Sequence, residues 1–235
     1  MSLAEKIGGV QHRIATAALR CGRKAEAITL MAVTKTVSPE RIREAYDAGL
    51  RVYGENRIQE FAGKVEVLHG LSDAEWHMIG HLQTNKAVRA VELFRHVDSV
   101  DSARLARKLN DAASETRKRV SVLIEINIGG EQAKSGVAPD SAELEQILNS
   151  APELTSLEFQ GLMTVPPYNE DPEQSRPYFR QMRKLFDQIA SRNLPSVRME
   201  VLSMGMSHDF EAAIEEGSTC VRIGTAIFGE RPISV

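Results

Sequence analysis

The chain opens with apolar residues that alternate at spacings of four and three positions, which places them on one face of a helix. Ser2 and Glu5 have the spacing of a capping box, so this helix is predicted to begin near residue 3. The apolar stripe consists of Leu3, Ile7, Val10, Ile14 and Ala17.

After this helix the pattern of apolar residues changes to short runs of β-branched and other apolar residues, each followed by a longer segment with helical spacing. Such runs are typical of buried strands, and their regular alternation with helical segments is typical of a parallel sheet. Eight strands are predicted, over residues 28–35, 51–55, 75–82, 96–100, 120–128, 157–165, 198–203 and 220–228.

Helix signals fall between these runs. Ser38 followed by Pro39 is typical of a helix start, because the serine can cap the first turn and proline tolerates the first helical position. Asn56 and Gln59 have the spacing of a second capping box. Gly49 is suited to end the helix that begins after Ser38.

One extra helix followed by eight strand and helix units predicts a single domain over residues 1–235, a (β/α)8 barrel of the TIM type. An open, doubly wound sheet is the competing topology. It is disfavoured because no Gly-x-Gly-x-x-Gly sequence follows the first strand and no Walker-type loop occurs in the chain. No linker or shift in composition divides the sequence.

Composition and charge limit the class of protein, its partners and its cellular compartment. The 235 residues include 29 Lys and Arg against 32 Asp and Glu, and 42% are apolar, which is typical of a globular protein that has no general attraction for nucleic acid. Cys21 and Cys220 form no metal-binding motif, and neither a signal peptide nor a membrane span is evident. A cytoplasmic protein without membrane or nucleic-acid partners is therefore expected.

The first predicted strand ends in Lys35, which shares a face with Met31 and Val33. Functional groups in barrels gather at the C-terminal ends of the strands. A lysine that points into the barrel there is partly desolvated, which favours the neutral amine that a Schiff base requires. A lysine whose ammonium group reaches solvent is the alternative.

The last predicted strand carries Arg222 on the same face as Cys220 and Gly224. An arginine that points into a barrel keeps its charge and needs a partner. Gly224 and Thr225 follow at the loop, and Ser203 to Ser207 precede the next helix. Loops after the seventh and eighth strands of barrels often bind phosphate through backbone N–H groups, although ordinary glycine turns explain the same residues.

No metal site is predicted. His77 and His81 have the spacing of a metal pair only on a helix, and on a strand they would lie about 13 Å apart at ~3.3 Å per residue. A serine hydrolase is disfavoured because the sequence has no Gly-x-Ser-x-Gly motif.

Six motifs taken together resemble the pyridoxal phosphate homeostasis protein family, also called the proline synthase co-transcribed family. The resemblance covers nearly the whole chain, and six motifs in the same order are more specific than any one alone. They are Ala32-Val33-Thr34-Lys35, Tyr53-Gly54-Glu55-Asn56, the segment 77–86 (HMIGHLQTNK), Gly161-Leu162-Met163, Leu202-Ser203-Met204-Gly205-Met206-Ser207 and the segment 221–229 (VRIGTAIFG).

This resemblance implies a barrel like the N-terminal domain of alanine racemase that holds pyridoxal 5′-phosphate (PLP) as a Schiff base on Lys35. It also implies a second lysine, Lys134, in cofactor handling, whereas Val37 stands where some members have another lysine. The remaining positions that it matches to the cofactor are Ser203, Gly224 and Thr225 at the phosphate, Arg222 at the pyridine nitrogen, and Asn56 beside the ring.

Two features favour a carrier of PLP over an enzyme. Arg222 cannot give up its proton, so beside the pyridine nitrogen it weakens the ring as an electron sink. Alanine racemase also has an arginine there, so Arg222 alone does not exclude catalysis. Alanine racemase takes a tyrosine base from a second domain, whereas this sequence ends a few residues after its eighth predicted strand and its tyrosines show no matching context. These tyrosines are Tyr46, Tyr53, Tyr168 and Tyr178.

From this resemblance we expect a PLP-binding protein, monomeric as the family commonly is and without catalytic residues of its own. It would buffer PLP and deliver it to apo-enzymes through transient contact. Two alternatives stay open. One is a PLP-dependent enzyme such as an amino-acid racemase, and the other is an aldolase that uses Lys35 on a phosphorylated sugar.

Overall fold

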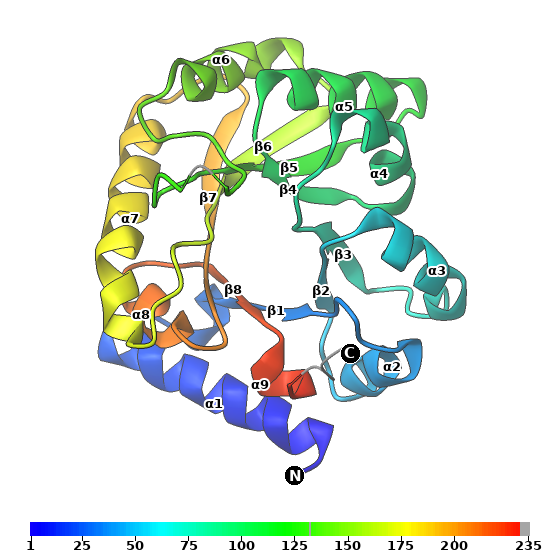
Figure 1. The fold of residues 1–235 in the computed structure, drawn as a ribbon, viewed down its shortest axis with the longest axis vertical. Coiled ribbons are helices and arrows are strands. Elements are labelled where there is room, and N and C mark those ends of the chain that lie inside the picture. The colour runs from blue at the N-terminus through cyan, green and yellow to red at the C-terminus, as the bar shows by residue number, and fades with distance from the viewer. Residues whose placement is uncertain (132, 231–235) are drawn as a thin grey trace.

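Eight parallel strands close into a barrel in the computed structural model, which describes residues 1–131 and 133–230 (Figure 1). Each strand pairs with the next along the chain, and β1 pairs with β8, with Thr29 opposite Cys220 and Ala32 opposite Ile223. This closure confirms the predicted barrel and excludes the open sheet. The strands are β1 (Thr29–Val33), β2 (Val52–Glu55), β3 (Glu75–Met78), β4 (His96–Val100), β5 (Val120–Glu125), β6 (Leu157–Met163), β7 (Val197–Met206) and β8 (Cys220–Ile223).

Helices surround the barrel in chain order (Figure 1). The α-helices are α1 (Leu3–Arg20), α2 (Pro39–Asp47), α3 (Ile58–Leu68), α4 (Ala87–Leu93), α5 (Ala103–Glu115), α6 (Ala142–Ser150), α7 (Arg176–Ser191), α8 (Phe210–Glu215) and α9 (Thr225–Phe228). Short 3₁₀ turns, labelled η, are η1 (Ala25–Ala27), η2 (Thr84–Lys86), η3 (Ala151–Glu153) and η4 (Pro172–Ser175).

The N-terminal helix α1 is the element that adds to the eight strand and helix units, and it lies against α8 and α9 (Figure 1). Its predicted capping box is present, because Glu5 N–H donates to Ser2 Oγ at 3.2 Å and Ser2 N–H donates to the Glu5 carboxylate at 2.7 Å. The predicted apolar stripe is buried along its whole length. The helix therefore covers the part of the barrel where the first and last strands meet.

The hydrophobic core lies between the strands and the surrounding helices. Trp76 of β3 illustrates it, because its ring centroid lies 4.8 Å from those of both Tyr53 and Phe61. Since successive strand residues face opposite sides, the neighbours of Trp76 in β3 face the interior of the barrel. The interior is consequently the more polar side of this part of the wall.

Several predicted boundaries are wrong for local reasons. Strand β8 ends at Ile223, because the Gly224 carbonyl accepts hydrogen bonds from the N–H groups of Ile227 and Phe228 and so starts α9. Strand β7 continues to Met206, three residues beyond the predicted end. The predicted Asn56 capping box is absent, since α3 starts one residue later with Arg57 as its N-cap and no side-chain cap bond.

Within the part of the chain that the structure describes, we find no helix with the length and apolar character that crossing a membrane requires.

Candidate functional site

A cavity of about 480 Å³ opens where β1, β7 and β8 end. The segments that follow these three strands supply most of its wall, as expected for the C-terminal face of a barrel. The lining comprises Val33, Lys35, Thr36, Val37, Ser38, Arg41, Tyr168, Met206, Ser207, His208, Arg222, Gly224, Thr225, Phe228, Gly229 and Glu230.

Four of the predicted site residues meet in this wall. Lys35 follows β1, while Arg222, Gly224 and Thr225 belong to the end of β8 and the start of α9. The pairing of β1 with β8 brings them together, because Met31 of β1 lies opposite Arg222. A lysine and an arginine far apart in the sequence thus face one cavity.

Arg222 points into the barrel and is only 3% exposed. Its guanidinium donates to the Ser203 hydroxyl and to the Thr164 carbonyl oxygen, both at 2.6 Å. The predicted partners are therefore present, but both are neutral. Burial lowers the pKa of Arg222, and nearby carboxylates such as Asp98 oppose this effect.

Two serines of the segment 203–207 have different contacts, although the family resemblance pointed only to Ser203. Ser203 is fully buried in β7, and its hydroxyl accepts the hydrogen bond from Arg222. Ser207 lines the cavity, and its hydroxyl accepts from the N–H groups of Gly224 and Ala226 at 3.2 and 3.3 Å. Ser203 thus positions Arg222, and Ser207 is the serine that lines this cavity. A contact of Ser203 with a phosphate stays a prediction.

Asn56 lies beside the wall and is not among the residues that line the cavity. Its Oδ1 is buried and has no hydrogen-bond partner among the described residues. The backbone of Asn56 is packed tightly against Gly80, where an added Cβ would lie 2.3 Å from the Asn56 carbonyl oxygen. Gly80 therefore keeps Asn56 close to β3.

The segment around Lys35 is held by α3, which the sequence did not indicate. The Lys64 ammonium donates to the Thr34 carbonyl oxygen at 2.9 Å and to the carboxylates of Glu55 and Glu60 at 3.1 and 2.6 Å. Glu60 in turn accepts from the N–H of Thr36 at 2.5 Å, and Thr36 has a left-handed φ of 63°. The residues on both sides of Lys35 are thus fixed to one ion-pair network.

Glu125 lies at the end of β5 and is 7% exposed. Burial raises the pKa of its carboxyl to about 7, the charge of Asp101 acts in the same direction, and a hydrogen bond from Ser135 opposes them. Arg222 also lowers this pKa through its charge. The interior of the barrel therefore contains a carboxyl group that titrates near neutrality.

Lys134 lies outside the lining of the cavity. Its ammonium donates to the Pro166 carbonyl oxygen at 3.1 Å and forms an ion pair with Glu131. Gln132, two residues before Lys134, lies outside the described residues. A role of Lys134 in cofactor handling stays a prediction.

Tyr168 lines the cavity, although no motif in the sequence indicated a function for it. Its side chain is 74% exposed, and its ring centroid lies 5.7 Å from that of His208. This tyrosine therefore stands at the rim, in contact with solvent.

His77 and His81 have different hydrogen-bond partners. Nδ1 of His77 lies 3.1 Å from both carboxylate oxygens of Asp98, and Nδ1 of His81 lies 2.9 Å from Asp101.

Sequence comparisons identify relatives over the full length of the chain. Residues 8–232 match the family model described as alanine racemase, N-terminal domain. A pyridoxal phosphate homeostasis protein from Aquifex aeolicus is 47% identical over 98% of this chain and 99% of its own length. The protein of the same name from Escherichia coli K12 is 42% identical over 99% of this chain and 98% of its own.

Solved structures agree with these matches. PipY from Synechococcus elongatus, with PLP bound, superimposes with a TM-score of 0.83 at 34% identity and covers 97% of this chain and 100% of its own. An alanine racemase from Clostridium difficile has a TM-score of 0.67 at 15% identity, over 95% of this chain and 57% of the racemase. The latter comparison establishes a shared fold only.

Proposed function

Because this chain belongs to the pyridoxal phosphate homeostasis protein family, whose domain is that of the alanine racemase N-terminus, we propose that it binds PLP at Lys35 and buffers or delivers it. The observation that carries the proposal is the shared cavity of Lys35 and Arg222. This cavity places an amine and a fixed positive charge together at the C-terminal face of the barrel.

The donor set of the cavity fits the cofactor. PLP, when bound, would supply an aldehyde that the amine of Lys35 would hold through a reversible Schiff base. The Ser207 hydroxyl accepts from the N–H groups of Gly224 and Ala226, and its own proton remains as a donor suited to a phosphate. The buried, unpartnered Oδ1 of Asn56 provides an acceptor near the wall. We infer that Thr225 adds a hydroxyl donor from the start of α9.

Arg222 supports the role of a carrier. A guanidinium is a donor only, and it does not transfer its proton at ordinary pH. Placed at the pyridine nitrogen, it would leave that nitrogen without a proton and so disfavour the chemistry that needs an electron sink. Release of PLP needs only the reversal of the Schiff base, so Arg222 does not hinder it.

We infer that the protein acts in the cytoplasm as a monomer and passes PLP to apo-enzymes through transient contacts. The free Cys21 and Cys220 suit a reducing compartment. Binding of a reactive aldehyde at the half-buried Lys35 would also protect other amines in the cell.

The first test is an absorbance spectrum of the purified protein, followed by borohydride reduction and peptide mass mapping. We expect a yellow protein whose reduced pyridoxyl label lies on Lys35, with colour and label lost in Lys35→Ala. Lys184→Ala, on the exposed face of α7, is the matched control and should keep both. A protein that takes up no added PLP would exclude both the carrier and the racemase, and would favour a sugar-phosphate aldolase.

The second test separates the carrier from a PLP-dependent enzyme. A catalyst would exchange the α-proton of an amino acid for solvent deuterium at rates of about 1 to 1000 per second. We expect no exchange at such rates across a panel of amino acids, either in the parent protein or in Tyr168→Phe, which alters the tyrosine at the rim. Fast exchange that disappears in Tyr168→Phe would show that this tyrosine is a catalytic base and that the carrier function is wrong.

A further inference from the structure

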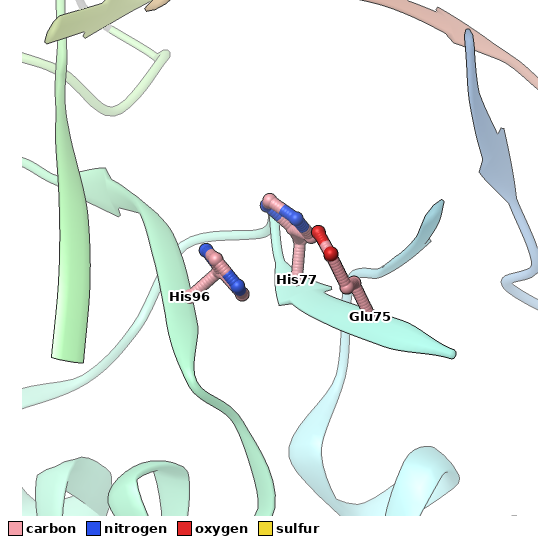
Figure 2. A group of neighbouring side chains, drawn as sticks. All are labelled: Glu75, His77 and His96. Atoms are coloured by element: carbon pink, nitrogen blue, oxygen red, sulfur yellow. The ribbon is translucent and has the colours of Figure 1, made fainter. Parts of the chain in front are cut away.

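A group of side chains that can bind a metal ion lies at the opposite end of the barrel from Lys35. Glu75 is the first residue of β3 and His96 is the first residue of β4, whereas Lys35 follows the C-terminal end of β1. Strands β3 and β4 are paired in register, with His77 opposite His96. Figure 2 shows the three side chains projecting from these two strands toward a common space.

The donor atoms of this group are close enough to share an ion. One donor atom from each of Glu75, His77 and His96 lies within 4.8 Å of the other two. Bonds of about 2.0 to 2.2 Å from zinc to nitrogen or oxygen allow two donors to be at most about 4 Å apart. Side-chain rotations that bring the donors together by about 1 Å therefore suffice.

His77 is oriented for coordination by Asp98, which is 2% exposed. Because Nδ1 of His77 lies 3.1 Å from both oxygens of the Asp98 carboxylate, Nδ1 carries the proton and donates it. The lone pair of the ring is then on Nε2. This Nε2 atom is buried and has no hydrogen-bond partner among the residues that the structure describes.

The two imidazole rings lie face to face, with centroids 4.1 Å apart and an angle of 13° between their planes. Coordination requires the lone pairs to converge, so one ring must turn out of this stack when an ion binds. Glu75 is exposed, and the two histidines are half-buried.

We propose that Glu75, His77 and His96 bind one divalent transition-metal ion, with zinc as the preferred ion and Asp98 as the residue that orients His77. Two imidazoles and one carboxylate are a typical ligand set for Zn²⁺, whereas Mg²⁺ and Ca²⁺ prefer sites made of oxygen atoms. Three protein ligands leave a fourth position for water. The ion would join the starts of β3 and β4, and the site is independent of the proposed PLP cavity.

The test is calorimetric titration of the full-length, chelator-treated protein with Zn²⁺, and separately with Mg²⁺. We expect one Zn²⁺ per chain and no measurable binding of Mg²⁺ at the same concentrations. His77→Gln and His96→Gln should each weaken Zn²⁺ binding by at least about tenfold, and Asp98→Asn by about 10- to 100-fold through loss of the orienting bond. His12→Gln, on the exposed side of α1, is the matched control and should bind as the parent does.

Folding of each variant is checked by far-UV circular dichroism and by pyridoxyl labelling of Lys35 at the other end of the barrel. If a histidine variant does not fold, Glu75→Gln serves instead, because Glu75 is exposed and its change removes a charged ligand without altering the core. We expect weaker Zn²⁺ binding with an unchanged fold. The proposal is wrong if the parent protein binds no stoichiometric Zn²⁺, or if folded His77→Gln, His96→Gln or Glu75→Gln binds it as tightly as the parent.

Discussion

Lys64 and Arg222 are both buried cations near the Lys35 segment, but their partners differ in charge. Lys64 contacts two carboxylates and one carbonyl oxygen, and these bonds fix Thr34 and Thr36. Arg222 contacts a hydroxyl and a carbonyl oxygen, and none of the described carboxylates forms an ion pair with it. The charge of Lys64 is thus compensated within the wall, whereas the charge of Arg222 remains available to the cavity.

This difference separates a structural cation from a functional one. A buried ion pair is costly to break, because removal of one partner leaves the other charged and desolvated. An arginine with neutral partners leaves behind only polar groups when it is removed. Four changes test this distinction, and Trp76, the single tryptophan, reports unfolding in all of them.

The largest effect is expected for Lys64→Met. It leaves Glu55, which is fully buried, without its cation, and should lower the free energy of unfolding by about 3–5 kcal/mol. Urea unfolding followed by Trp76 fluorescence measures this change. Adding Glu55→Gln should recover part of the loss, and Lys184→Met on the surface of α7 should cost little. Equal losses in Lys64→Met and Lys184→Met would contradict a compensated structural pair.

The next effect concerns pH and Glu125, whose raised pKa of about 7 reflects burial first. Between about pH 4.5 and pH 7 the folded protein then binds more protons than the unfolded chain, so the free energy of unfolding falls as the pH rises. The contribution of Glu125 to this fall is at most about 3 kcal/mol. In Glu125→Gln that part of the fall should disappear, as urea unfolding at several pH values would show. Because the charge of Arg222 lowers the pKa of Glu125, Arg222→Met should raise this pKa further. An unchanged pH dependence in Arg222→Met would contradict a charged Arg222.

Arg222→Met should destabilise less than Lys64→Met does. It leaves the Ser203 hydroxyl and the Thr164 carbonyl oxygen without their donor, which costs about 1–3 kcal/mol. Its main effect should be on PLP, and equilibrium dialysis should show weaker retention of the cofactor. Unchanged retention together with a loss as large as that of Lys64→Met would mean that Arg222 is structural.

The smallest effect is expected for Glu60→Gln, at about 1 kcal/mol, because Glu60 is partly exposed and Lys64 keeps Glu55. Although burial opposes it, hydrogen bonds from Lys64 and Thr36 hold the pKa of Glu60 below its ordinary value. The stabilisation by Glu60 is therefore present above the pKa of the unfolded chain and is lost as the pH falls through the lower, folded value. Acid unfolding should lose this component in the variant, whereas a stability difference that stays constant down to low pH would contradict the assignment.

The sequence was sufficient to predict the eight strands and the barrel, because strand and helix periodicities are local signals that tertiary contacts here reinforce. It also predicted that Arg222 points inward and has partners, since alternation along β8 fixes its side. The chemistry of those partners could not be predicted, because Ser203 lies on β7 and Thr164 directly follows β6.

What the sequence missed depends on pairing between strands or between a helix and a strand. Lys64 looks like an ordinary helix-surface lysine until α3 is placed beside β1 and β2. His77 and His96 come together only through the register of β3 with β4. Ser203 was assigned to the phosphate by the family resemblance, whereas Ser207 was noted only as part of the segment that precedes the next helix. The place of Ser207 in the cavity depends on β7, which continues to Met206.

The pairing of β1 with β8 has a consequence for biosynthesis. Lys35 and Arg222 lie about 190 positions apart, and β8 is the last strand of the barrel to leave the ribosome. Contacts between such distant segments form late, since their loop-closure entropy is large. A growing chain therefore cannot present the complete cavity before β8 has been synthesised. Ligand binding by this protein should report closure of the barrel, and a chain that lacks β8 should not sequester the ligand.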